Sequence, residues 1–201
     1  MAATCDIPVL VLAGGGSERF GSNKALADFG GKPLIAHVIE RLATQTTGAI
    51  AINAQTDGEL AHLAAPIVSD DKWHGQGPLA GVHSALNWAR MQGAERVATT
   101  AVDLPFVPMD LLATLSKAGA PSIAMSGARQ HPVTGLWSAS QIDALDQYLR
   151  SGRRSAHGWA EYCEAAIVEF RASPGKGDPF YNINTPKDLE RAASYEKARR
   201  R

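Results

Sequence analysis

The segment from Leu12 to Lys24 reads LAGGGSERFGSNK, and the rest of the chain is best interpreted outward from it. It overlaps the end of residues 7–13, an apolar run with the length and the Val/Leu content of a buried strand. A glycine-rich turn after a strand lets successive backbone amides approach phosphate oxygens closely. Arg19 and Lys24 add positive charge that a purely structural turn does not need. The segment therefore predicts a phosphate-binding loop.

This loop differs from two common nucleotide-binding motifs. After Gly16 and Gly21, the pair Ser22-Asn23 stands where a Walker A loop has Lys followed by Ser or Thr. The third glycine of the dinucleotide fingerprint GxGxxG is also missing. The sequence thus argues against a kinase-like P-loop and against a dinucleotide-binding protein.

Strand-like runs and helical segments alternate along the chain. The predicted strands are short runs rich in Val, Ile and Ala, at residues 7–13, 49–53, 66–68, 97–102, 122–125 and 165–170. Segments with the apolar spacing of helices lie between the first four, at residues 33–42, 58–63 and 79–91, and prolines 33, 78, 108 and 186 mark helix starts. This order predicts an α/β fold: one domain over residues 1–201 with a mostly parallel, doubly wound, Rossmann-like sheet.

Composition excludes several classes of partner. Twenty Lys and Arg residues balance twenty Asp and Glu residues, so no overall field attracts nucleic acid or an anionic membrane. The apolar run at residues 7–13 is too short to span a bilayer and no basic cluster precedes it, so we expect a cytoplasmic protein. Cys5 and Cys163 lack CxxC spacing and a histidine partner, which argues against a disulfide framework and a zinc site.

Asp103 follows the predicted strand at 97–102. A carboxylate at the carboxyl edge of a central strand suits Mg²⁺ that bridges a triphosphate, although a helix-capping Asp before Leu-Pro is the alternative. Because Mg²⁺ often takes only one or two protein ligands, an amide oxygen of Asn182 or Asn184 could be a second one. Both asparagines could instead be turn residues.

The loop resembles the LAGGxSxRMGxxK motif of nucleotidyltransferases that have a glycosyltransferase-A-like α/β fold. One branch of them, the molybdenum cofactor guanylyltransferases, is similar over nearly the whole chain. The similar segments are Gly31-Lys-Pro-Leu34, Gly77-Pro-Leu-Ala-Gly81, Val102-Asp-Leu-Pro-Phe-Val-Pro108, His131-Pro132 and Asn182-Ile-Asn-Thr-Pro186. Phe20 stands where that branch usually has Met, and Asn23 where Asp often precedes the lysine, which bears on the preferred base and not on the reaction.

The resemblance implies roles for individual residues. Those implied for nucleotide binding are Leu12, Ala13, Gly14, Gly15, Lys24, Asn53, Asp70 and Asp103, with Asp71 as an adjacent alternative to Asp70. Arg19, Lys24 and Asp103 are implied as catalytic residues, and Asp103 as the Mg²⁺ ligand. Asn182, Asn184 and His131 are implied to lie beside the acceptor, although a lone histidine is more often structural.

The resemblance also implies a reaction, the transfer of GMP from GTP to molybdenum-bound molybdopterin with Mg²⁺ and the release of pyrophosphate. GTP and molybdopterin are then the partners, with transient contacts to other molybdenum cofactor biosynthesis proteins or to apo-molybdoenzymes. No Ser/His/Asp or Cys/His arrangement occurs at motif positions, and none is required because a phosphate acceptor is already anionic at neutral pH.

Three other functions remain open from the sequence. A cytidylyltransferase for the same pterin tends to read LAAG with RFG; here the LAGG at Leu12 favours guanine, while Phe20 leans the other way. Another small cofactor guanylyltransferase would share the opening loop. A regulatory protein that binds GTP without turnover would leave Asp103 and the asparagine segment superfluous.

Overall fold

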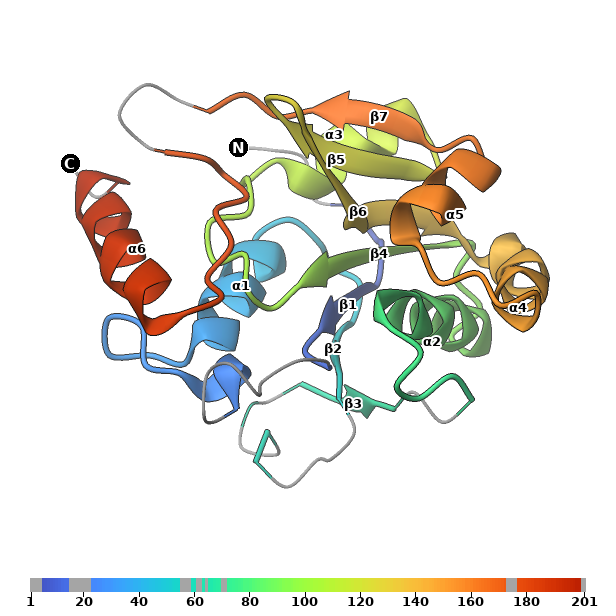
Figure 1. The fold of residues 1–201 in the computed structure, drawn as a ribbon, viewed down its shortest axis with the longest axis horizontal. Helices are drawn as coiled ribbons and strands as arrows, with labels where there is room; N and C mark the ends of the chain where they lie inside the picture. Colours follow the sequence, from blue (N-terminus) through green and yellow to red (C-terminus); the bar gives the residue numbers. More distant parts are fainter. Residues whose placement is uncertain are drawn as a thin grey trace.

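The fold of the chain was obtained as a computed structural model, which describes residues 5–14, 23–54, 59–60, 63, 65–69, 72–172 and 177–199. Within these residues a seven-stranded sheet has the order β3-β2-β1-β4-β6-β5-β7 (Figure 1). The strands are β1 (Val9–Leu12), β2 (Ile50–Asn53), β3 (Ile67–Val68), β4 (Arg96–Ala101), β5 (Ser122–Ser126), β6 (Arg129–Ser138) and β7 (Ala166–Glu169). Among these described strands only β6 runs antiparallel to its neighbours, so the single α/β domain has the mostly parallel sheet that the sequence predicts.

Helices cover both faces of the sheet (Figure 1). They are α1 (Leu34–Ala43), α2 (Pro78–Met91), α3 (Leu111–Ala118), α4 (Ile142–Arg150), α5 (Ala156–Tyr162) and α6 (Pro186–Arg199). The alternation of side chains along β1 explains the two cores, because Val9 and Val11 pack with α1 and α3 while Leu10 and Leu12 pack with α2 and α4. A strand that is apolar on both faces is typical of a sheet covered on both sides.

Most of the predicted elements are confirmed, with ends that differ by at most two residues. The six predicted strands correspond to β1, β2, β3, β4, β5 and β7, and the predicted helices at 33–42 and 79–91 correspond to α1 and α2. The start of α6 is also confirmed, since Asp188 Oδ2 accepts a hydrogen bond from the Thr185 amide at 2.8 Å and Thr185 Oγ1 accepts one from the Asp188 amide at 3.2 Å. The predicted helix at 58–63 lies largely outside the described residues.

The sequence pattern missed β6, which lies between β4 and β5 in the sheet. Its sequence RQHPVTGLWS begins with polar residues and contains Pro132 and Gly135, so it shows neither a continuous apolar run nor strict alternation.

No helix in the described residues combines the length and the apolar content of a membrane span.

Candidate active site

The ends of three neighbouring parallel strands bring the glycine-rich segment and Asp103 to one edge of the sheet. Leu12 at the end of β1 is in register with Asn53 of β2 on one side and with Ala101 of β4 on the other. Beyond the strands the pairing continues, since the Val102 amide donates to the Leu12 carbonyl at 3.0 Å. Ligands of parallel sheets bind at this carboxyl edge.

A narrow pocket of about 130 Å³ opens at this edge, and we call it the strand-end pocket. Its wall includes six of the residues predicted for nucleotide binding: Leu12, Ala13, Gly14, Lys24, Asn53 and Asp103. Gly77, Pro78 and Gly81, from the first turns of α2, complete one side of it. The amino end of a helix has backbone amides without intrahelical partners, so this side of the pocket favours an anion.

Gly81 allows α2 to approach the pocket closely. A Cβ atom at this position would lie 2.8 Å from Asn53 Oδ1 and 2.9 Å from Leu12 Cδ2. The Asn53 amide is held in place from the other side, where its Nδ2 donates to the Val68 carbonyl at 3.0 Å. The glycine in the motif Gly77-Pro-Leu-Ala-Gly81 is therefore explained by the space that two pocket residues need.

Within the described residues, the Asp103 carboxylate pairs with the Lys24 ammonium through one of its two oxygens. Lys24 Nζ lies 2.8 Å from Asp103 Oδ2 and 2.8 Å from Asn184 Oδ1, and the Lys24 and Asp103 side chains are 13% and 17% exposed. The other oxygen, Asp103 Oδ1, and Asn182 Oδ1 are buried and have no hydrogen-bond partner within the described part of the chain. Since α3 begins only at Leu111, after the N-cap Asp110, the helix-capping interpretation of Asp103 is not supported.

An irregularity in β6 forms the second wall of the site. The pairing between β5 and β6 jumps from Ile123↔Gly135 to Ala124↔His131, so residues 132–134 bulge out of the ladder. Proline has no amide to donate to a ladder, which explains why Pro132 lies at such a break. Bulges of this kind redirect side chains and often occur beside active sites.

The bulge borders a wider pocket of about 440 Å³, which we call the bulge pocket. Arg129 and His131 of β6, His157 of α5 and Asn182 from the segment before α6 also line it. Three residues, Ala101, Asp103 and Val133, line both this pocket and the strand-end pocket. The Asp103 carboxylate therefore stands where groups bound in the two pockets would meet.

His131 is a buried histidine, 7% exposed. Its Nε2 lies 2.9 Å from Ser126 Oγ, and its ring packs on Phe180 with 4.5 Å between the ring centroids. Burial lowers the pKa of His131 to about 4, and Arg129 acts in the same direction, against the opposite influence of Asp178 and Asp103. The imidazole is therefore neutral at neutral pH.

A cluster of charges anchors the loop that leads to the strand-end pocket. Asp146 of α4 lies 2.5 Å from Lys72 Nζ and 2.7 Å from Arg150 Nε, and these hydrogen bonds, that of Lys72 first, lower its pKa to about 2. Arg154 Nε donates to Gln76 Oε1 at 2.8 Å, and its guanidinium lies 5.6 Å from the ring centroid of Trp73. Arg150 and Arg154 are thus both engaged with protein groups.

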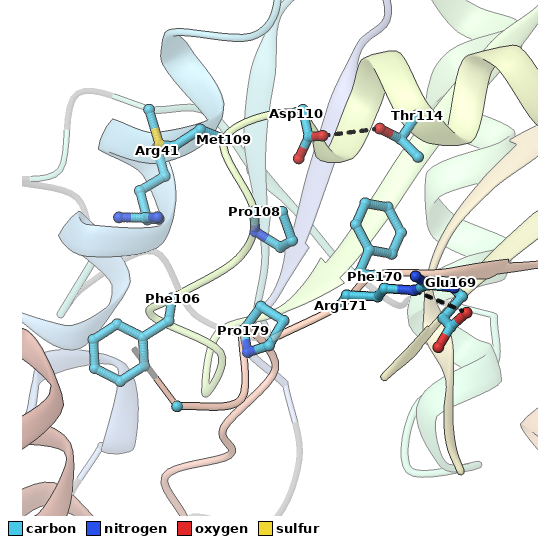
Figure 2. A pocket seen from close by; sticks show the side chains of 11 residues that line it. Arg41, Phe106, Pro108, Met109, Asp110, Thr114, Glu169, Phe170, Arg171 and Pro179 are labelled. Carbon is cyan, nitrogen blue, oxygen red and sulfur yellow. Dashed lines mark hydrogen bonds and ion pairs between the residues drawn. The ribbon is translucent and has the colours of Figure 1, made fainter. Parts of the chain in front are cut away.

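A third cavity, of about 470 Å³, lies between α1, α3 and the segment after β7, and contains none of the predicted site residues (Figure 2). Its polar side chains already have protein partners. Arg41 Nε donates to the Val107 carbonyl at 2.8 Å, and Arg171 Nε lies 3.6 Å from Glu169 Oε2. This cavity is separate from the site around Asp103.

Some predicted site residues fall outside the described part of the chain, namely Gly15, Arg19, Asp70 and its alternative Asp71. The structure brings together the others, which are Leu12, Ala13, Gly14, Lys24, Asn53, Asp103, Asn182, Asn184 and His131. Sequence reasoning did not select Arg129 or His157 as site residues. Arg129 lies two residues before His131 of the HP step, which was the available signal for it, whereas His157 has none.

Comparison with known proteins agrees with this geometry. A family model described as a MobA-like NTP transferase domain matches residues 9–165. A molybdenum cofactor guanylyltransferase from Cereibacter sphaeroides is 41% identical over 92% of this chain and 94% of its own length. One from Acidiphilium cryptum is 37% identical over 91% of this chain and 92% of its own length.

Solved structures show the same relationship. Molybdopterin-guanine dinucleotide biosynthesis protein A from Archaeoglobus fulgidus superposes with a TM-score of 0.68 at 25% identity, covering 97% of this chain and all of that one. A 4-diphosphocytidyl-2C-methyl-D-erythritol synthase from Anaerococcus prevotii has a TM-score of 0.69 at 13% identity, over 95% of this chain and 96% of its own, and shares the fold alone. The chain belongs to the MobA-like NTP transferase family and is a nucleotidyltransferase.

Proposed function

We propose that this nucleotidyltransferase transfers GMP from GTP to the terminal phosphate of molybdenum-bound molybdopterin, which releases pyrophosphate and forms the molybdopterin guanine dinucleotide cofactor. The names of its relatives support these substrates. The observation that carries the proposal is the position of Asp103 between the strand-end pocket and the bulge pocket. The nucleotide belongs in the first pocket and the acceptor in the second.

The proposed reaction needs alignment and neutralisation of charge more than it needs a base. An oxygen of the acceptor phosphate forms a bond to the α-phosphorus of GTP, the bond to the bridging oxygen breaks, and pyrophosphate leaves with the electron pair. A phosphate monoester has a second pKa near 6, so the nucleophile is already anionic at neutral pH. Lys24 and the amino end of α2 offset the repulsion between the two anions, and Arg19 belongs to the same proposal.

The residues around Asp103 fit a magnesium ion. A carboxylate and amide oxygens are hard donors of the type that Mg²⁺ prefers, and Asp103 Oδ1 and Asn182 Oδ1 are buried without hydrogen-bond partners in the described residues. Bound Mg²⁺ would supply positive charge to the triphosphate. Asn184 instead holds the Lys24 ammonium.

Nucleoside recognition and acceptor binding complete the proposal. Asn53 lines the strand-end pocket, and we assign the nucleoside to it together with Asp70 and the loop up to Gly15. His131 and Asn182 line the bulge pocket, where Arg129 adds a positive charge suited to an anionic acceptor. Transient contacts with other cofactor biosynthesis proteins or with apo-molybdoenzymes would supply the acceptor and receive the product.

Incubation with each of four nucleoside triphosphates, Mg²⁺ and molybdopterin tests the proposal, with products resolved by mass and pyrophosphate release measured in parallel. We expect kcat/KM for GTP to exceed that for CTP at least about tenfold, a difference of about 1.4 kcal/mol. Comparable values would overturn the guanine assignment, and a cytosine dinucleotide as main product would favour the cytidylyltransferase. No pyrophosphate release with any nucleotide would reject the transfer reaction itself.

A further inference from the structure

The segment at residues 178–184 carries both asparagines of the site, and it is fixed at several points. At its start, Asp178 Oδ1 accepts a hydrogen bond from the Phe180 amide at 2.8 Å. Near its end, the Ile183 amide donates to the Asp103 carbonyl at 3.0 Å, and the Ile183 side chain is fully buried beside Phe29 and Phe106. Asn182 and Asn184 flank this second anchor.

The side chain of Phe180 also fixes the start of this segment, and its position depends on contact with His131. Phe180 is fully buried between the ring of His131, at 4.5 Å and 31°, and the ring of Phe170, at 5.5 Å and 80°. His131 is fixed in turn, because its Nε2 is within hydrogen-bond distance of Ser126 Oγ in the neighbouring strand β5. The pair Ser126–His131 thus presents one ring face to Phe180.

We propose that His131 is a positioning residue: it holds Phe180, and through Phe180 it keeps Asn182 and Asn184 against Asp103 and Lys24. This inference rests on the proposed function for its kinetic consequences only. A neutral imidazole is suited to the role, since it packs on Phe180 without the cost of a buried cation, and burial keeps its pKa low. The two residues of the HP step then have separate structural roles. His131 packs on Phe180, and Pro132 begins the bulge in β6.

Hydrogen exchange tests the physical claim without any substrate. We expect His131→Ala and Phe180→Leu to speed exchange at least about tenfold in peptides that contain the Ile183 amide. His131→Phe keeps a flat ring against Phe180 and should leave this exchange close to that of the wild type. Tyr162→Leu is the matched control, because Tyr162 stacks on Trp159 at 5.7 Å outside both pockets. Unchanged exchange at Ile183 in Phe180→Leu would overturn the proposal.

Kinetics distinguish positioning from direct contact with the acceptor. We expect Phe180→Leu and His131→Ala to raise the KM for the acceptor about tenfold, with the KM for GTP within twofold of the wild type and with rescue in His131→Phe. If His131→Phe is as defective as His131→Ala while Phe180→Leu behaves as wild type, His131 binds the acceptor directly and the proposal fails. If His131→Ala does not fold, as judged by the loss of a cooperative urea unfolding transition, Phe180→Leu and His131→Phe still decide between these outcomes. A wild-type protein without transfer activity would reject the proposed function, yet the exchange result would still decide the role of His131.

Discussion

The strand-end pocket is assembled from residues that follow the ends of adjacent parallel strands, whereas the bulge pocket takes its residues from a break in β6, from α5 and from the segment before α6. The first pocket depends on one glycine-rich segment and on the register of β1 with its two neighbours. The second depends on contacts between distant parts of the chain, such as His131 with Phe180. Asp103, Ala101 and Val133 line both, so changes at residues that line only one pocket should have separable effects, and Asp103 is the charged residue among the three that are shared.

Asp103→Asn should have the largest effect because it removes the charge that both pockets share. Turnover should fall about 10² to 10³-fold, or about 2.7 to 4 kcal/mol, and added Mg²⁺ should recover part of the loss. Pyrophosphate release across a range of Mg²⁺ concentrations measures this. Asp110→Asn, an exposed carboxylate after the same strand, is the control that should retain wild-type turnover. Full activity of Asp103→Asn with an unshifted Mg²⁺ requirement would mean that Asp103 binds no metal.

Lys24→Ala should come next and should act mainly through the strand-end pocket. The ammonium contacts Asp103 and Asn184, so its loss removes a charge beside the place that we propose for the phosphates of the nucleotide. We expect turnover to fall about 10²-fold with an unchanged melting temperature. Lys32→Ala, which breaks an exposed ion pair with Glu40, should be close to wild type. Wild-type kinetics at both limiting and saturating GTP would place Lys24 outside the reaction.

A pH experiment examines His131, which lines the bulge pocket and not the strand-end pocket. The His131 pKa is about 4 in the folded protein and near 6.5 when unfolded, so the unfolded state takes up a proton first as the pH falls. The neutral His131 therefore makes its full contribution to the free energy of unfolding above pH 6.5. This contribution is lost between pH 6.5 and about 4, and it is smaller by about 2 kcal/mol at pH 4.5. Urea unfolding at pH 7 and pH 4.5 should show this extra loss in the wild type and not in His131→Phe. Equal losses in the two proteins would show that His131 is not held neutral by the fold.

Arg154→Ala should have the smallest effect and should be confined to the strand-end pocket. The change removes the stacking on Trp73 and the hydrogen bond to Gln76 that anchor the loop before Gly77. We expect the KM for GTP to rise three- to tenfold, or about 1 kcal/mol, with kcat within twofold. Arg153→Ala is the matched control, since Arg153 stacks on Tyr148 and Tyr162 at 4.8 and 5.4 Å and not on this loop. A larger change in the KM for the acceptor than in the KM for GTP would assign Arg154 to the bulge pocket.

The same contrast explains how much of the molecule the sequence could predict. Strand ends and a glycine-rich turn are local patterns, so the order of residues along the chain is enough to place Leu12, Asn53 and Asp103 at one edge of the sheet. The bulge pocket arises where β6 loses its register, and a polar strand with an internal proline gives no periodic signal. The burial of His131 depends on Phe180, 49 positions away, and no spacing rule connects two such residues.

The sharing of Asp103 by two pockets has a consequence for the kinetics of the transfer that we propose. In the proposed reaction each substrate has its own pocket, so both would be bound at once and no covalent enzyme intermediate is needed. The product, however, joins a nucleotide to the former acceptor and would occupy both pockets together. It should therefore act as a bisubstrate inhibitor that competes with either substrate, and its departure, which must vacate two pockets in one event, is a natural candidate for the slow step of the cycle.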